Sequence, residues 1–215
     1  MKKILVTALL LGLFALIGAG LVAYTHYKTH DKIEAQKIKK RLRSLNKIVR
    51  PDEYDNAILD DKIEITDRAT FGTDKAVSVY RARKQGKPVA LVFTAFAPDG
   101  YNGDIELLIG VRHDGTISGV RVVDHKETPG LGDGIDIRKS NWITGFNDKS
   151  LTNPGEPGWH VKKDGGQFDQ FTGATITPRA VVKAVHRVLK YAVRNRDRLF
   201  RMQKTVPAHN TTDKP

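Results

Sequence analysis

A tract of small and hydroxylated residues directly before a long helical pattern is the part of this sequence best suited to chemistry. It runs Asp169-Gln-Phe-Thr172-Gly173-Ala174-Thr175 and ends on a hydroxyl. We predict that Thr177 caps the following helix and that Pro178 takes its first position. Because a helix N-terminus carries unpaired N–H groups and partial positive charge, an anionic phosphate near Thr175 would be well placed. A glycine turn leading into a capped helix is the alternative for this pattern taken alone.

A second motif, Glu127-Thr128-Pro129-Gly130-Leu131-Gly132, predicts a tight turn. Thr-Pro-Gly fits a type II turn, with proline at the second position and glycine supplying positive φ at the third. Such a turn exposes backbone N–H groups with little side-chain bulk, which would suit a planar ring with carbonyl oxygens. In this interpretation Glu127 accepts a hydrogen bond from a ring N–H and the backbone donates to the ring carbonyls. The alternative is a glycine-rich connection between a strand and a helix.

Hydrophobic periodicity predicts the elements that position these motifs. Strands are expected near 77–80, over 88–96, and as a hairpin of 105–111 and 117–123 joined by Asp114-Gly115. Residues 147–170, rich in Gly, Pro, Asn and Lys, predict a long surface loop. Apolar residues then recur at helical spacing, at Val181, Val182, Val185, Val188, Leu189 and Ala192. Trp142 and Trp159 are expected in the core, with shielding of a bound ring as the alternative.

The N-terminus predicts a membrane anchor over residues 1–27. An uncharged apolar run from Ile4 to Tyr24 follows Lys2 and Lys3. As a helix it measures about 31 Å, enough to cross the hydrocarbon core of a bilayer. A cleavable signal peptide is the alternative, with a small-x-small site at Gly18-Ala-Gly20. Because that site lies inside the run and apolar residues continue beyond it, we favour a retained helix.

Residues 28–50 predict a basic amphipathic connector helix. They contain nine Lys or Arg against Asp31 and Glu34, which have capping-box spacing. Apolar residues lie on one face before Pro51 stops the pattern, at Ile38, Leu42, Leu45 and Val49. The rest of the chain divides into one domain over 51–200 and a disordered tail over 201–215.

The composition excludes several kinds of cofactor and catalytic group. The 215-residue chain has no cysteine, which excludes disulfides, thiolate-held iron–sulfur clusters, covalently attached haem and a catalytic thiol. His26 and His30 have helical spacing but no third ligand nearby, so we predict no metal site. The net charge of +12 comes from the flanks, since twenty acidic side chains outnumber fifteen basic ones between Pro51 and Pro178. We therefore expect a membrane surface as partner and no nucleic acid.

The tract ending at Thr175 resembles the Asp-x-x-(Ser/Thr)-Gly-Ala-(Thr/Ser) sequence that flavin transferases modify. Further matching segments occur in the same order, at Tyr101-Asn-Gly103-Asp-Ile, 105–124 and 125–132, behind a single apolar N-terminal segment. Over nearly its whole length the chain is similar to flavin-carrying subunits of membrane redox pumps. The nearest resemblance is to the G subunit of the Rnf (or Rsx) ion-translocating electron-transport complex. The C subunit of the sodium-translocating NADH:quinone reductase is a more distant relative.

This resemblance implies an α+β FMN-binding domain with an antiparallel sheet and flanking helices, behind one transmembrane helix. FMN would be joined through its phosphate to the Thr175 hydroxyl by a flavin transferase. Further cofactor-binding residues would be Glu127, Thr128, Gly130, Leu131, Gly132, Asp169, Thr172, Gly173 and Ala174. No catalytic base, nucleophile or metal is expected, because the electron chemistry belongs to the cofactor.

The resemblance also implies an electron relay within an ion-translocating oxidoreductase whose other subunits carry iron–sulfur and flavin centres. One alternative is the flavin-binding subunit of a sodium-translocating NADH:quinone reductase. Another is a membrane-anchored flavin sensor or scaffold without turnover.

Topology is the point on which charge and resemblance disagree. Lys2 and Lys3 precede the apolar run, and a larger basic cluster from Lys28 to Arg43 follows it. Taken alone, the positive-inside rule places the domain in the cytoplasm. The resemblance implies a single-pass inner-membrane protein with its domain on the periplasmic side, where flavin attachment occurs. We follow the resemblance here.

Overall fold

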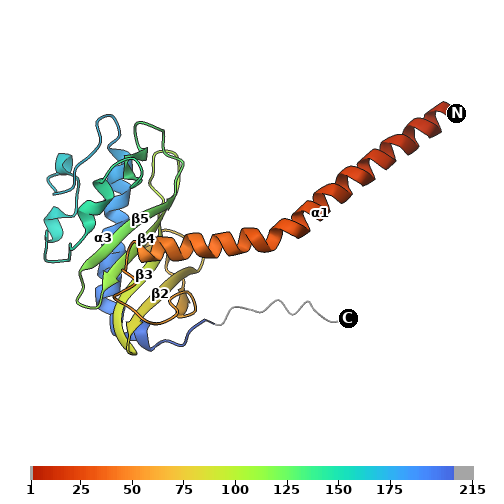
Figure 1. The fold of residues 1–215 in the computed structure, drawn as a ribbon. Coiled ribbons are helices and arrows are strands. Elements are labelled where there is room, and N and C mark those ends of the chain that lie inside the picture. The colour runs from red at the N-terminus through yellow and green to blue at the C-terminus, as the bar shows by residue number, and fades with distance from the viewer. Residues whose placement is uncertain (1, 206–215) are drawn as a thin grey trace. The chain divides into compact units, whose positions relative to one another are not determined.

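The computed structural model describes residues 2–205, and the chain divides after Arg43 into two compact units. Figure 1 shows the order of the elements along the chain. They are α1 (Lys2–Asn46), β1 (Lys62–Ile65), α2 (Arg68–Phe71), β2 (Val77–Lys84), β3 (Lys87–Ala97), β4 (Ile105–Arg112), β5 (Ile117–Asp124), the short 3-10 helices η1 (Asp133–Ile135), η2 (Trp142–Phe146), η3 (Glu156–Gly158) and η4 (Lys162–Asp164), and α3 (Ile176–Arg201).

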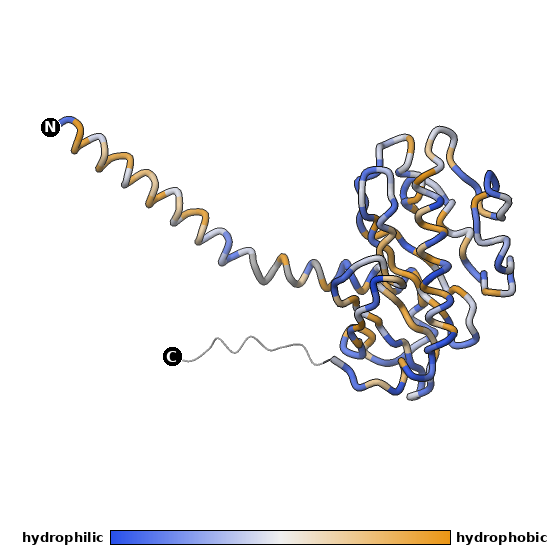
Figure 2. Tube along the Cα trace, turned by 180° about the vertical axis from the view of Figure 1, so that it is seen from behind, coloured by the Kyte–Doolittle hydropathy of each residue, from blue (hydrophilic) through white to orange (hydrophobic). Residues whose placement is uncertain are grey.

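The first 28 residues of α1, Lys2–Thr29, form a helix apolar and long enough to cross a membrane. Figure 2 shows the change from hydrophobic to hydrophilic residues along α1. The predicted break between anchor and connector is absent, because α1 is one helix from Lys2 to Asn46. Lys, Glu, Ala and Gln dominate the residues after Asp31, and these straight-chain or small residues continue a helix readily. The predicted capping box depended on the side chains of Asp31 and Glu34, which lie outside the described part of the chain.

The domain is built on five antiparallel strands in the order β1-β2-β3-β4-β5, so each strand pairs with the next one along the chain. This confirms the predicted α+β fold with an antiparallel sheet. The turn between β2 and β3 has positive φ at both Gln85 (+52°) and Gly86 (+75°), as a type I′ hairpin turn requires. Two elements, β1 and α2, were not predicted, because each is only four residues long.

Helix α3 covers one face of this sheet. Its predicted apolar positions are all at most 1% exposed, at Val181, Val182, Val185, Val188, Leu189 and Ala192. They pack in one core with alternate residues of the strands, among them Phe93, Leu107 and Ile109. Burial of this face fixes both the position of α3 and that of the tract that leads into it.

The opposite face of the sheet is covered by residues just after Arg43. Leu45, Ile48 and Val49 are buried, and Gly110 and Gly119 face each other in the β4–β5 register. A Cβ atom on Gly110 would lie 2.2 Å from Ile48 Cγ2, so the absence of a side chain there makes room for Ile48. The domain therefore begins at Ser44 rather than at the predicted Pro51.

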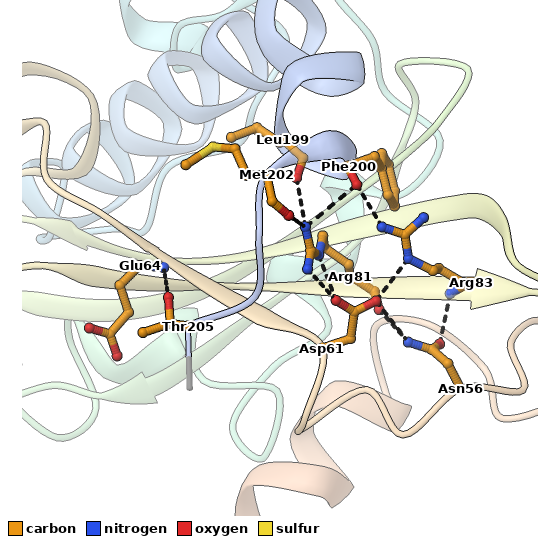
Figure 3. A network of polar contacts seen from close by, with 9 residues as sticks. All are labelled: Asn56, Asp61, Glu64, Arg81, Arg83, Leu199, Phe200, Met202 and Thr205. Atoms are coloured by element: carbon orange, nitrogen blue, oxygen red, sulfur yellow. Dashed lines mark hydrogen bonds and ion pairs between the residues drawn. The ribbon is translucent and has the colours of Figure 1, made fainter. Parts of the chain in front are cut away.

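The C-terminal end of α3 is held by two arginines of β2 (Figure 3). Arg81 donates to the carbonyls of Leu199 and Met202, Arg83 donates to the carbonyl of Phe200, and Asp61 pairs with both guanidinium groups. Farther on, Thr205 N donates to the carbonyl of Lys62 in β1, at 2.9 Å. Residues 202–205 are thus bonded to the domain and do not belong to a disordered tail. Residues 206–215 of the predicted tail lie outside the described part.

Candidate functional site

A pocket of about 490 Å³ brings the two predicted motifs together. It lies where the tract before α3, the first turn of α3 and the turn after β5 meet. Its lining consists of Tyr101, Glu127, Thr128, Leu131, Gly132, Gly173, Ala174, Thr175, Ile176 and Thr177. Seven predicted cofactor-binding residues are among them.

Thr175 stands at the cap position of α3, and its side chain makes no capping hydrogen bond. Within residues 2–205 its hydroxyl has no hydrogen-bond partner, and the residue is half-exposed beside the pocket. The first amides of α3 have no carbonyl one turn earlier to bond, and the helix dipole is positive at this end. A free hydroxyl thus sits where a phosphate group would be stabilised.

The predicted capping by Thr177 is wrong, because α3 already begins at Ile176. Thr177 and Pro178 are its second and third residues, and both are buried. Proline is accepted there because first-turn amides have no intrahelical partner in any case. The Thr177 hydroxyl instead donates to Glu127 Oε2 inside the domain.

Glu127 connects three segments of the site. The residue is 4% exposed, and its Oε1 atom accepts a hydrogen bond from Asn102 N at 3.1 Å. Its other oxygen accepts from Thr177 at the start of α3. Because both carboxylate oxygens already have donors from the protein, Glu127 holds the pocket walls together. That Glu127 also accepts from a ring N–H stays a prediction, because each carboxylate oxygen can accept a second hydrogen bond.

The turn at Thr128–Leu131 has the predicted form. Leu131 N donates to Thr128 O at 3.1 Å, and Gly130 has a φ of +77°. Its amides are used internally, however, since Gly132 N also donates to Thr128 O and Gly130 N donates to Asp133 Oδ1 at 2.8 Å. The expectation that these amides donate to a ring is therefore not supported. The turn presents the Leu131 side chain to the pocket instead.

An apolar rim surrounds the pocket, formed by Tyr101, Leu131 and Ile176. These side chains are 65%, 49% and 47% exposed. Among the described residues outside α1, Met202 is the one other large apolar side chain with such exposure. Exposed apolar groups that converge on one pocket suit a flat, largely apolar ring. Tyr101 and Ile176 were not predicted as site residues, although Tyr101 is the first residue of one of the segments that resemble the family.

Comparison with known proteins decides the family. Residues 100–190 match the model of the FMN-binding domain, and residues 1–48 match that of the RnfG N-terminal region. The chain is 50% identical over 201 residues to the G subunit of the ion-translocating oxidoreductase complex of Pseudoalteromonas atlantica, covering 93% of this chain and 94% of the relative. The corresponding protein of Pseudomonas aeruginosa is 50% identical over 199 residues, with 93% of each chain covered. That of Vibrio cholerae is 46% identical over 191 residues, covering 89% of this chain and 91% of the relative.

The chain belongs to the RnfG family, the G subunits of ion-translocating oxidoreductase complexes. The predicted resemblance is thereby confirmed, and FMN is the cofactor of the domain that this family shares. Whole-length similarity to RnfG proteins also favours this family over the quinone-reductase alternative.

Three predicted cofactor-binding residues of this RnfG-family chain lie outside the pocket lining. Gly130 supplies the positive φ that the turn requires. Asp169 pairs with Lys162 at 2.6 Å, and its carbonyl accepts from Trp142 Nε1 at 2.7 Å. Thr172 is exposed to solvent. Cofactor binding by Asp169 and Thr172 stays a prediction. Trp159 is 2% exposed and belongs to the core, as expected.

The charge of the pocket bears on how this RnfG-family chain holds a flavin phosphate. None of the lining residues is Lys or Arg, and Glu127 is the one charged residue among them. A free phosphate would therefore find helix amides but no cationic side chain to pair with. The residues fit FMN through the free Thr175 hydroxyl, the start of α3 and the apolar rim.

Proposed function

We propose that this chain is the flavin-carrying electron relay of an ion-translocating oxidoreductase, with FMN esterified through its phosphate to Thr175. One observation supports this proposal most strongly. The Thr175 hydroxyl is free of hydrogen bonds within residues 2–205, lies beside the pocket and precedes the first turn of α3. Thr177, two residues on, is less suited to attachment because its hydroxyl is buried and bonded to Glu127.

The absence of cations from the pocket lining supports covalent attachment. A phosphate that finds no Lys or Arg is weakly held by helix amides alone, whereas an ester to Thr175 retains it permanently. When bound, FMN supplies one- and two-electron chemistry that no side chain provides. The residues of the chain orient it: the apolar rim packs against a flat ring, and the Glu127–Thr177 contact fixes the distance between the two pocket walls.

We infer the partners from the absence of cysteine in the chain and from the names of its relatives. Without cysteine it holds no thiolate-bound iron–sulfur cluster, so any such centre of the complex lies on another subunit. The relatives are subunits of ion-translocating oxidoreductase complexes. We place this chain in such a translocase, with iron–sulfur and flavin centres on its neighbours and a flavin transferase acting during maturation.

For localisation we propose that α1 is a retained anchor in the inner membrane and that the domain faces the periplasm. Alkaline phosphatase fused after Pro215 is expected to be active in intact cells, since that enzyme requires the periplasm. Fusion after Pro215 leaves the domain intact, because residues up to Thr205 are bonded to it. An inactive phosphatase together with a fluorescent cytoplasmic reporter at that position would contradict the periplasmic placement.

The relay itself is tested in membranes of the native host carrying Thr175→Ala. We expect complex-dependent electron transfer to be lost while the complex still assembles. Thr175→Ser keeps the hydroxyl and is expected to retain transfer. Full transfer in the Thr175→Ala membranes would favour a sensor or scaffold role instead.

A further inference from the structure

A second cavity, of about 430 Å³, lies farther along α3 and shares no residue with the flavin pocket. Its wall on the α3 side is formed by residues spaced three or four apart, which places them on one face of the helix. They are Arg179, Val182, Lys183, His186, Arg187 and Lys190. The facing wall comes from the loop that contains Trp159, His160, Val161 and Asp164.

Two ion pairs connect the walls at opposite ends of the cavity. Asp164 of the loop pairs with Arg179 near the start of α3. Glu156, before the loop, accepts from Lys190 Nζ at 2.7 Å, three turns along the helix. The cavity between them is therefore bounded by fixed charges, and its central cations are Lys183 and Arg187.

Cations outnumber carboxylates among the charged residues of the lining. Four Lys or Arg and two His line it, whereas Asp164 is the one carboxylate among the lining residues. Lys183 reaches outward to Asp99 at 2.8 Å. For Arg187, no carboxylate of residues 2–205 lies within ion-pair distance.

Arg187 is half-buried without adequate compensation. Its Nε atom is buried and has no hydrogen-bond partner, and one terminal nitrogen reaches the Phe96 carbonyl at 3.4 Å. Burial lowers the pKa of the Arg187 guanidinium, in keeping with an environment that penalises its charge. Asp99 attracts this charge only from beyond ion-pair distance and is itself bonded to Lys183, so an anion in the adjoining cavity would stabilise the half-buried guanidinium.

His186 lines the same cavity and lies beside a carboxylate. The residue is 9% exposed, and its ring stacks on Trp159 with centroids 4.9 Å apart. Its Nε2 atom lies 3.2 Å from Glu156 Oε2 but outside hydrogen-bond geometry, so it is buried without a hydrogen bond. His186 Nε2 therefore already faces a carboxylate, whereas Arg187 Nε is buried with neither a hydrogen bond nor a carboxylate of the described residues beside it.

We propose that this cavity binds a small oxyanion, a phosphate or carboxylate group, between Lys183 and Arg187. Guanidinium and ammonium groups pair with such oxygens through short charge-assisted hydrogen bonds. The volume suits a small molecule. The site does not depend on the flavin, since the two cavities share no lining residue.

Calorimetric titration of the full-length chain in phosphatidylcholine nanodiscs tests this, with inorganic phosphate and succinate as probes. We expect Arg187→Gln and Lys183→Gln each to weaken binding by about tenfold or more, the typical contribution of a charge-assisted contact. Arg194→Gln removes the same charge from an exposed position of α3 and is expected to change affinity less than about twofold. Thr175→Ala is expected to bind phosphate and succinate with the affinity of the unmodified chain. This result separates the present site from the flavin proposal.

Nanodiscs that contain phosphatidylglycerol distinguish the source of the anion. Unchanged phosphate affinity there indicates a free anion. Weakened affinity in the unmodified chain, but not in Arg187→Gln, identifies a lipid headgroup as the occupant. No binding of either probe up to about 10 mM, or equal binding by Arg187→Gln and Arg194→Gln, would overturn the proposal.

Discussion

The hydroxyl of Thr177 donates a hydrogen bond to the carboxylate of Glu127, and both groups are buried. This contact joins the first turn of α3 to the segment after β5. The two sequence motifs that form the flavin pocket are thus held together by a polar bond inside the protein. Glu127 and Thr177 therefore both line the pocket and fix its shape.

Replacement of Thr177 by Val is predicted to leave a buried Glu127 oxygen without its donor. The free energy of unfolding should fall by about 1–3 kcal/mol, the usual cost of an unsatisfied buried polar group. Thr172→Val, at an exposed position of the same tract, is the control and should change stability by less than about 0.5 kcal/mol. Urea denaturation measures both, and equal stability of the two variants would contradict the role assigned to the Thr177–Glu127 bond.

Gly130→Val tests the turn after β5. The glycine has a φ of +77°, and a Cβ placed there would have no atom within 4 Å, so a side chain costs backbone strain rather than a clash. We expect a loss of roughly 1–2 kcal/mol in stability, with a shift in flavin absorbance and potential because Leu131 moves with the turn. Gly145→Val is the matched control, since its surroundings are equally open and its φ is not positive. An unchanged flavin spectrum and potential in Gly130→Val would make this turn a structural connection only.

Local patterns predicted most of the sheet and the long helix. The strands from β2 to β5 are alternating or continuous apolar runs separated by glycine turns, and α3 has a clear apolar stripe. These signals depend on neighbouring residues alone, so sequence was sufficient. The short strand β1 has too few residues for such a pattern to stand out.

The details of the site depend on contacts between distant segments. The local pattern favoured Thr177 as the cap of α3, but the Thr177 hydroxyl bonds to Glu127, which lies 50 residues away in the sequence. From the sequence, Glu127 was expected to accept a hydrogen bond from a ring N–H. Its actual donors, Asn102 and Thr177, cannot be recognised from local sequence. Tyr101 was missed for the same reason, since an exposed aromatic residue gains meaning only from the pocket it borders.

Arg81→Ala is predicted to be among the most destabilising single changes in the domain. Arg81 is 3% exposed, and its removal deprives the Leu199 and Met202 carbonyls of their donor and leaves Asp61 ion-paired with Arg83 alone. A loss of about 3–5 kcal/mol in the free energy of unfolding is expected for breaking a buried pair of this kind. Arg50→Ala removes an exposed pair with Glu53 and should cost at most about 1 kcal/mol. Similar losses in the two variants would show that Arg81 does not secure α3.

Asp136 predicts a specific acid dependence of stability. The hydrogen bond from Arg138 holds the pKa of the buried Asp136 carboxyl below its ordinary value. The unfolded chain therefore takes up protons first as the pH falls below about 3.9, so stability present at neutral pH is lost as the pH falls through the lowered pKa. Asp136→Asn should reduce stability at pH 7 and flatten the decline at acid pH.

The acid profile of Asp136→Asn is measured by urea denaturation across this range. Asp99, Asp114 and Asp164 have pKa values lowered in the same direction, so part of the acid decline is expected to remain. The exposed variant Asp104→Asn is the control and should reproduce the profile of the unmodified chain. An unaltered decline in Asp136→Asn would contradict the contribution assigned to this carboxyl.

The central claim is that FMN is carried on the Thr175 hydroxyl and on no other. Protein purified from its native host, denatured and digested, is analysed by mass spectrometry for the mass of an FMN phosphoester on the peptide that contains Thr172, Thr175 and Thr177. Fragmentation is predicted to place the flavin on Thr175, with the ester retained in Thr177→Val and lost in Thr175→Ala. Flavin on Thr177 or Thr172, or a denatured protein without flavin after co-expression with a flavin transferase, would contradict the account.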